Sequence, residues 1–239
     1  YTVRQTEVSP LGLILDKFGA LTTLKPLSEG WCYVEDEAAQ LVPFLLDVQP
    51  GQRVLDACAA PGGKSTHLAA LMHNEGEIVS MDRSVNRLQI LRENMKRLGI
   101  SCIHPMVGTW ERNMKFPSGL ASSLEKGFDR ILVDVPCSGL GVLRRHPEAK
   151  WKKSDQHLLK HQKLQGEILH RVSTYLRPGG VLVYSACSAE PEETTQVISQ
   201  FCLDHPDFRH ENAAPFFPCG GQTLTNQDGD LLTLGSIYD

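Results

Sequence analysis

The fold of this chain is decided by the stretch RVLDACAAPGGKS at residues 53–65, within a sequence of 239 residues. The apolar run at 53–56 predicts a strand, and the glycine-rich turn after it leads into a helix predicted from about Lys64 to His73. In open α/β sheets, nucleotide ligands bind at such junctions between strand and helix. We therefore expect residues 58–64 to border a ligand.

The sequence beyond this stretch continues to alternate between strands and helices. Further strands are predicted at 77–81, 103–107, 130–133 and 181–184. Amphipathic helices are predicted from Ser84 to Gly99 and from about Leu158 to Leu176, the latter ended by the Pro-Gly-Gly run at 178–180, and a last helix from Pro191. This alternation predicts an α/β fold with a doubly wound, mostly parallel sheet.

The first 50 residues break this alternation. We interpret residues 1–50 as a lead-in segment with one additional helix at 38–47, and residues 51–239 as the main domain. The hydrophobic content of 41% and the net charge of -4 are typical of a globular domain, and no apolar run is long enough to span a membrane. Because the sequence has neither an initiator methionine nor a signal-peptide pattern, we expect a fragment of a longer protein.

Seven cysteines are spread along the chain without any Cys-x-x-Cys pair. This spacing argues against a disulfide framework or a standard zinc site, so we expect no metal and a reduced, cytoplasmic protein with most thiols buried. Cys137 follows the fourth predicted strand, next to Asp134, and Cys187 follows the fifth. Because parallel strands end at one edge of a sheet, both thiols are predicted there, where a thiolate can act as a nucleophile.

Several interpretations of the glycine-rich turn compete. A phosphate-binding Walker A loop requires glycine where this chain has Cys58, and a dinucleotide-binding loop requires a third glycine that is absent. A nucleoside cofactor without a polyphosphate needs close backbone approach and a carboxylate for the ribose, which Asp82 can supply 19 residues after Gly63. S-adenosylmethionine meets these requirements. An ordinary tight turn and a P-loop-like nucleotide hydrolase remain alternatives.

Five motifs occur in order along the chain. They are the loop at 56–65, Asp82-Arg83, DVPCSG at 134–139, GVLRRHP at 141–147 leading to Lys150-Trp151, and YSACS at 184–188 followed by PEE at 191–193. Together they resemble the Sun/Nop family of RNA cytosine-C5 methyltransferases, most closely its bacterial Sun/RsmB type, which acts on 16S rRNA. The resemblance runs from about residue 30 to the end. It implies a Rossmann-like class I methyltransferase fold that uses S-adenosylmethionine.

The resemblance also implies a role for individual residues. Cys187 is the nucleophile that adds to cytosine C6, Cys137 assists release of the product, and Asp134 binds the base. Lys64 supports these catalytic residues. The implied cofactor-binding residues are Cys58, Ala59, Ala60, Pro61, Gly62, Gly63, Lys64, Asp82, Arg83, Arg87 and Asp134. Because both motifs carry a cysteine, the sequence alone leaves open which of the two attacks.

A basic stretch follows the Pro-Cys motif and is interpreted as an RNA-binding surface, with a solvated helix face as the alternative. The expected RNA-binding residues are Arg144, Arg145, His146, Lys150, Trp151 and Lys152. Chemistry at C5 requires an exposed base, so we expect the target cytosine of the rRNA to be single-stranded or flipped from its helix. We also expect the protein to be a monomer.

The sequence departs from the family pattern at a few positions. Thr109 replaces an aspartate and Ala186 replaces a threonine. The family's final strand is expected after Asp239, and most of the amino-terminal RNA-binding region is also absent from the sequence. A non-catalytic RNA-binding module on the same fold therefore remains an alternative to the enzyme.

Overall fold

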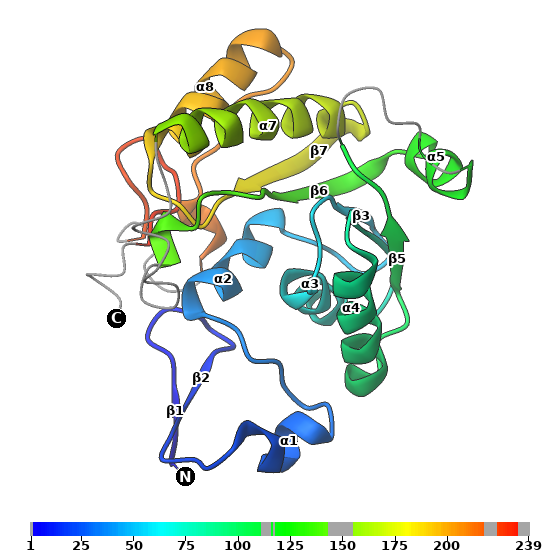
Figure 1. Cartoon of the computed structure of the whole chain (residues 1–239), viewed down its shortest axis with the longest axis vertical. Helices are drawn as coiled ribbons and strands as arrows, with labels where there is room; N and C mark the ends of the chain where they lie inside the picture. Colours follow the sequence, from blue (N-terminus) through cyan, green and yellow to red (C-terminus); the bar gives the residue numbers. More distant parts are fainter. Residues whose placement is uncertain (1, 111–115, 117, 143–154, 218–223, 234–239) are drawn as a thin grey trace.

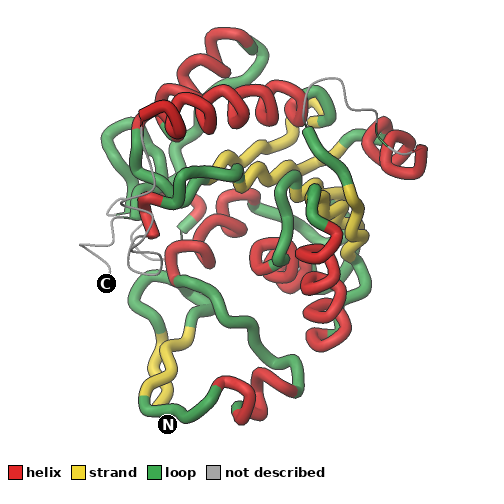
Figure 2. The backbone as a smooth tube through the Cα atoms, in the orientation of Figure 1, coloured by secondary structure: helices red, strands yellow, loops and turns green. Residues whose placement is uncertain are grey.

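A computed structural model of the chain describes residues 2–110, 116, 118–142, 155–217 and 224–233. At its centre is a parallel sheet with the strand order β5-β4-β3-β6-β7. The bounds are β3 Arg53–Asp56, β4 Glu77–Asp82, β5 Ile103–Val107, β6 Phe128–Asp134 and β7 Leu176–Ser185. Helices cover both faces of this sheet (Figures 1 and 2), so the predicted doubly wound α/β fold is confirmed.

Two apolar clusters form the core, one on each face of the sheet. Val54, Ile78 and Leu132 pack toward helices α3 (Gly63–Leu71) and α4 (Val85–Leu98). Their strand neighbours Leu55 and Ile131 point to the opposite face. That face is covered by α5 (Ser118–Glu125), α7 (Asp155–Ser173) and α8 (Thr195–Asp204). The central strands β3, β4 and β6 are therefore largely buried on both sides, as the continuous apolar run at 130–133 predicts for β6.

Three boundaries differ from the sequence-based prediction. The helix expected at 38–47 is split into α2 (Glu37–Leu41) and a 3-10 helix (Val42–Leu46) that contains Pro43, which has no N–H to continue an α-helix. The helix expected from Pro191 begins as a 3-10 turn (Pro191–Glu193), and α8 starts only at Thr195.

The third difference lies in strand β7. Helix α7 ends at Ser173, and Leu176 already pairs with Phe128 in the sheet. The Pro-Gly-Gly run at 178–180 therefore lies inside β7 and not at the end of the helix; regular pairing resumes where Val181 meets Arg130. Proline and glycine mark an irregularity in the strand here.

The lead-in segment contains a hairpin that sequence reasoning missed. Strands β1 (Thr2–Gln5) and β2 (Leu13–Asp16) pair antiparallel, and a short helix α1 (Lys25–Ser28) follows. In Figure 1 the hairpin and α1 lie apart from the central sheet, on the side of α2. Short 3-10 turns complete the structure at Leu21–Thr23, Leu140–Val142 and Ala214–Phe216. Among the helices that the structure describes, none is long and apolar enough to cross a membrane.

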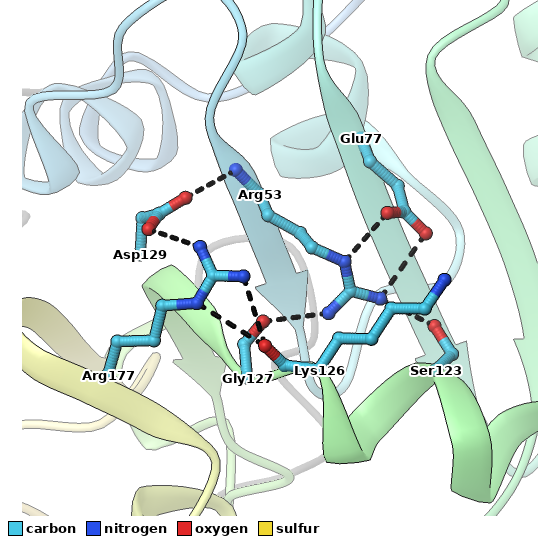
Figure 3. Close-up of polar contacts among 7 residues, drawn as sticks. All are labelled: Arg53, Glu77, Ser123, Lys126, Gly127, Asp129 and Arg177. Atoms are coloured by element: carbon cyan, nitrogen blue, oxygen red, sulfur yellow. Dashed lines mark hydrogen bonds and ion pairs between the residues drawn. The ribbon is translucent and has the colours of Figure 1, made fainter.

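A partly buried ionic network centred on Arg53 lies at the amino-terminal edge of the sheet (Figure 3). The guanidinium of Arg53 donates to Glu77 Oε2 at 2.7 Å, to the Gly127 carbonyl at 2.8 Å and to Ser123 Oγ at 2.7 Å. The Arg53 backbone N–H donates to Asp129 Oδ2 at 2.8 Å. Since these contacts fix the amino edge, the opposite, carboxyl-terminal edge remains for ligand binding.

Candidate active site

The glycine-rich turn after β3 is held tightly against its neighbours. The Ala59 N–H donates to the Met81 carbonyl at 2.9 Å. Gly62 has a φ of +109°, and a Cβ there would lie 2.4 Å from Leu91 Cδ1, so only glycine fits. A Cβ at Gly63, the first residue of α3, would come within 2.7 Å of Glu35 Oε1. Side chains of neighbouring segments therefore pack directly against the backbone of the turn.

Asp82 ends strand β4 beside this turn. Its Oδ1 accepts a hydrogen bond from the Ser84 N–H at 2.8 Å, and its Oδ2 accepts one from the Ala60 N–H at 3.2 Å. Arg87 Nη1 lies 3.4 Å from Oδ2. Asp82 and Arg87 are thus brought together as the sequence analysis expected, whereas Arg83 is exposed and takes part in none of the polar contacts within the described residues. The orientation of the Asp82 carboxylate is fixed before any ligand binds.

Lys64 and Asp134 form an ion pair where β3 and β6 lie side by side. Lys64 Nζ donates to Asp134 Oδ2 at 2.8 Å, and Ser185 Oγ donates to Oδ1 at 2.7 Å. Burial opposes the charge on Lys64, but the neighbouring Asp134 carboxylate outweighs it and raises the pKa of Lys64. Ser185 was missed by sequence reasoning; its only signal was its place at the end of β7, two residues before Cys187.

The two motif cysteines meet at the ends of β6 and β7. Cys137 Sγ and Cys187 Sγ lie 2.9 Å apart, and both are free thiols. Cys187 is exposed and Cys137 is partly buried. The hydrogen bond between them lowers the pKa of Cys187, while the same contact together with burial raises that of Cys137. Because Cys187 is the more exposed of the two, water can better stabilise a thiolate there than at Cys137.

Glu193 fixes the loops that carry these cysteines. This fully buried carboxylate accepts hydrogen bonds from the Ser138 N–H at 2.7 Å, from Ser138 Oγ and from Gln165 Nε2 at 3.3 Å. Burial opposes its ionisation, but the Ser138 hydrogen bonds prevail and lower the pKa of Glu193. The two loops are also joined by a hydrogen bond, which the Gly141 N–H donates to the Cys187 carbonyl at 3.0 Å. In the sequence, Glu193 was noted only as part of the PEE motif at 191–193.

Some expectations are wrong or lie outside the described residues. Of the six cysteines in the described part of the chain, only Cys102 is fully buried, so the prediction that most thiols are buried is wrong. The expected RNA-binding residues all lie outside the described residues: Arg144, Arg145, His146, Lys150, Trp151 and Lys152. Within the described residues, no group of three or more His, Cys, Asp or Glu side chains could hold a metal ion.

Sequence comparisons find relatives along most of the chain. The family described as 16S rRNA methyltransferase RsmB/F matches residues 43–230. A probable ribosomal RNA small subunit methyltransferase B of Synechocystis is 41% identical over 218 residues, covering 91% of this chain and 47% of the relative. The Klebsiella pneumoniae ribosomal RNA small subunit methyltransferase B is 38% identical, covering 87% and 46%. The chain spans about half the length of the curated relatives it matches.

Solved structures share the architecture. A methyltransferase homologue from Pyrococcus horikoshii matches with a TM-score of 0.72 and 33% identity, covering 85% of this chain and 62% of the other. NSun6 from Pyrococcus horikoshii, determined with SFG, matches with a TM-score of 0.67 and 29% identity, covering 78% and 46%. These likenesses confirm the predicted Rossmann-like class I methyltransferase fold.

Proposed function

Because this chain belongs to the 16S rRNA methyltransferase RsmB/F family, we propose that it transfers a methyl group from S-adenosylmethionine to C5 of a cytosine in small-subunit ribosomal RNA. The observation that carries this proposal is the pair of thiols 2.9 Å apart beside the Lys64–Asp134 ion pair. Methylation at C5 requires a nucleophile for C6 and a second group that helps release the product. Two adjacent cysteines supply both.

The turn at 58–64 and Asp82 fit the cofactor. Gly62 and Gly63 let Leu91 and Glu35 pack directly against the turn, and the buried Asp82 carboxylate has acceptor capacity left for ribose hydroxyls. Burial raises the pKa of the Cys58 thiol, which therefore stays neutral. When bound, S-adenosylmethionine supplies an electrophilic methyl group on a positively charged sulfur.

The charged groups around the turn argue against the alternative function, that of a nucleotide hydrolase. Lys64, which a phosphate-binding loop needs for the phosphates, donates instead to Asp134. The turn is also bordered by the carboxyl groups of Asp82 and Glu35. A polyphosphate would be repelled by these groups, whereas a cationic methyl donor would be attracted.

Different residues of the site carry out successive steps of the proposed reaction. The Cys187 thiolate forms a bond to C6 of the cytosine, which makes C5 nucleophilic toward the methyl group. Asp134, held by Lys64 and Ser185, hydrogen-bonds the N3/N4 edge of the base and stabilises the adduct. Cys137 assists removal of the C5 proton, after which the bond between Cys187 and C6 breaks and the methylated base leaves.

The proposal extends to the parts of the chain around this site. The basic stretch that contains Arg144, Arg145, Lys150 and Lys152 contacts the RNA backbone, and Trp151 stacks on an unpaired base. Residues 51–239 supply the catalytic domain, and residues 1–50 are the end of an amino-terminal RNA-binding region.

The proposal is tested by methyl transfer from radiolabelled S-adenosylmethionine to small-subunit RNA, followed by nuclease digestion and mass spectrometry. We expect 5-methylcytidine in RNA incubated with the wild-type chain and none with Cys187→Ala. RNA that is bound but never methylated would favour the non-catalytic module. A methyl group on another atom would refute the proposed chemistry.

A further inference from the structure

The lead-in segment places an acidic side chain against the glycine-rich turn. A Cβ at Gly63 would lie 2.7 Å from Glu35 Oε1 and 3.1 Å from Tyr33 Cε1, so both side chains lie directly over the turn. The Glu35 side chain is only 13% exposed. A residue 28 positions before Gly63 therefore packs against the turn.

The Glu35 carboxyl group is largely, though not completely, buried. Within the part of the chain that the structure describes, no hydrogen bond reaches its carboxyl group, and the nearest basic atom is His67 Nδ1 at 3.9 Å. Burial lowers the pKa of His67 to about 4, so this ring is neutral near pH 7. The Lys64 ammonium is engaged by Asp134.

The carboxyl group is correspondingly hard to ionise in the free chain. Burial raises the pKa of Glu35 to about 7; the Lys64 charge opposes this shift, and the Asp134 and Asp36 charges add to it. A largely buried carboxyl group that receives no hydrogen bond from the protein has its acceptor capacity free for a donor on a ligand, and groups with shifted pKa values concentrate at such sites.

The order of the strands identifies the part of the ligand that faces Glu35. Asp82 on β4 lies on one side of β3, and Asp134 with the cysteines lies on the other. In the proposed function, Asp82 takes the ribose and the methyl group points toward Cys187. The amino-acid end of the cofactor is the remaining charged part, and a carboxyl group attracts its ammonium and repels its carboxylate.

We propose that Glu35 accepts a hydrogen bond from the α-ammonium group of the bound S-adenosylmethionine. This inference rests on the proposed function. It adds to the cofactor site a residue outside the loop motif, and it explains why the turn carries glycine at position 63, where any side chain would displace Glu35.

The test compares three ligands by isothermal titration calorimetry with the wild-type chain and Glu35→Gln. S-adenosylmethionine carries both the ammonium and the sulfonium, S-adenosylhomocysteine carries only the ammonium, and methylthioadenosine carries neither. We expect Glu35→Gln to weaken binding of the first two about tenfold and to leave methylthioadenosine within about twofold. Glu29→Gln is the matched control because Glu29 is exposed on the same segment, and all affinities should be unchanged.

Each other outcome overturns the inference in a distinct way. A loss confined to S-adenosylmethionine would mean that Glu35 faces the sulfonium. An equal loss for all three ligands would mean that the substitution distorts the turn, and unchanged affinities would mean that Glu35 does not contact the cofactor. If the wild-type chain binds none of the three, the proposed function itself fails, which is distinguishable from failure of the variant alone.

Discussion

At the scale of single residues, the site depends on buried groups that hold the reacting ones in place. Each oxygen of Asp134 accepts one hydrogen bond, from Lys64 or from Ser185, and keeps capacity for a further donor. Glu193 holds the loop that carries Cys137 through both polar groups of Ser138. These supporting contacts restrict the rotamers of the reacting groups, which is what positions an active site for catalysis.

Glu193→Gln should damage both stability and catalysis. The amide nitrogen of glutamine cannot accept a hydrogen bond, so one Ser138 donor would lose its buried partner. We predict a fall of about 2 kcal/mol in the free energy of unfolding, measured in urea. We also predict at least tenfold slower methyl transfer, with affinity for S-adenosylmethionine unchanged.

The neighbouring substitution Glu192→Gln is the control, because Glu192 accepts none of these hydrogen bonds and should leave both quantities near wild type. Equal effects of the two substitutions would contradict a positioning role for Glu193.

His67 should make the chain sensitive to acid. Its folded-state pKa of about 4 lies below the ordinary 6.5, so the unfolded chain takes up a proton first as the pH falls. The contribution of His67 to the free energy of unfolding should therefore decrease between about pH 6.5 and pH 4, by about 2 kcal/mol at pH 5, whereas the raised pKa of the neighbouring Glu35 adds stability over the same range. In His67→Leu this pH-dependent part should be absent. Urea unfolding of both proteins at pH 7.5 and pH 5 decides this, and an equal acid loss in both would refute it.

At the scale of elements, a helix or strand could be predicted from the sequence where the interactions that determine it are local. Helix α4 was predictable because Ser84 Oγ accepts the Arg87 N–H at its start and Gly99 adopts a φ of +68° at its end. The hairpin β1–β2 and the assignment of Leu176 to β7 depend on pairing with distant residues. The periodicity of a sequence does not indicate which distant residues a strand will pair with.

The hydrogen bonds of Arg53 should contribute to the stability of the sheet without affecting the cofactor site. Arg53→Met should lower the free energy of unfolding by about 3 kcal/mol, because Glu77, Ser123 and the Gly127 carbonyl would lose their shared donor. Affinity for S-adenosylmethionine should be unchanged, because the network lies at the edge opposite the turn. Urea unfolding and calorimetry give the two values. A folded variant with much weaker cofactor binding would contradict this separation of stability from the site.

At the scale of the whole molecule, the site joins positions far apart in the sequence: Glu35, Lys64, Asp82, Asp134 and Cys187. The strand order brings the last four to one edge, and this part of the site could be anticipated from motifs at strand ends. The supporting residues Ser185 and Glu193, and Glu35 in the lead-in segment, could not, because only the three-dimensional contacts distinguish them from other polar residues.

The central claim is that Cys187 attacks the base and Cys137 releases it. The most direct measurement is the covalent protein–RNA complex seen on denaturing gels after wild type, Cys137→Ala and Cys187→Ala are incubated with small-subunit RNA and S-adenosylmethionine. We predict that the complex accumulates with Cys137→Ala and is absent with Cys187→Ala. A complex that persists with Cys187→Ala and disappears with Cys137→Ala would reverse the two roles and contradict the account.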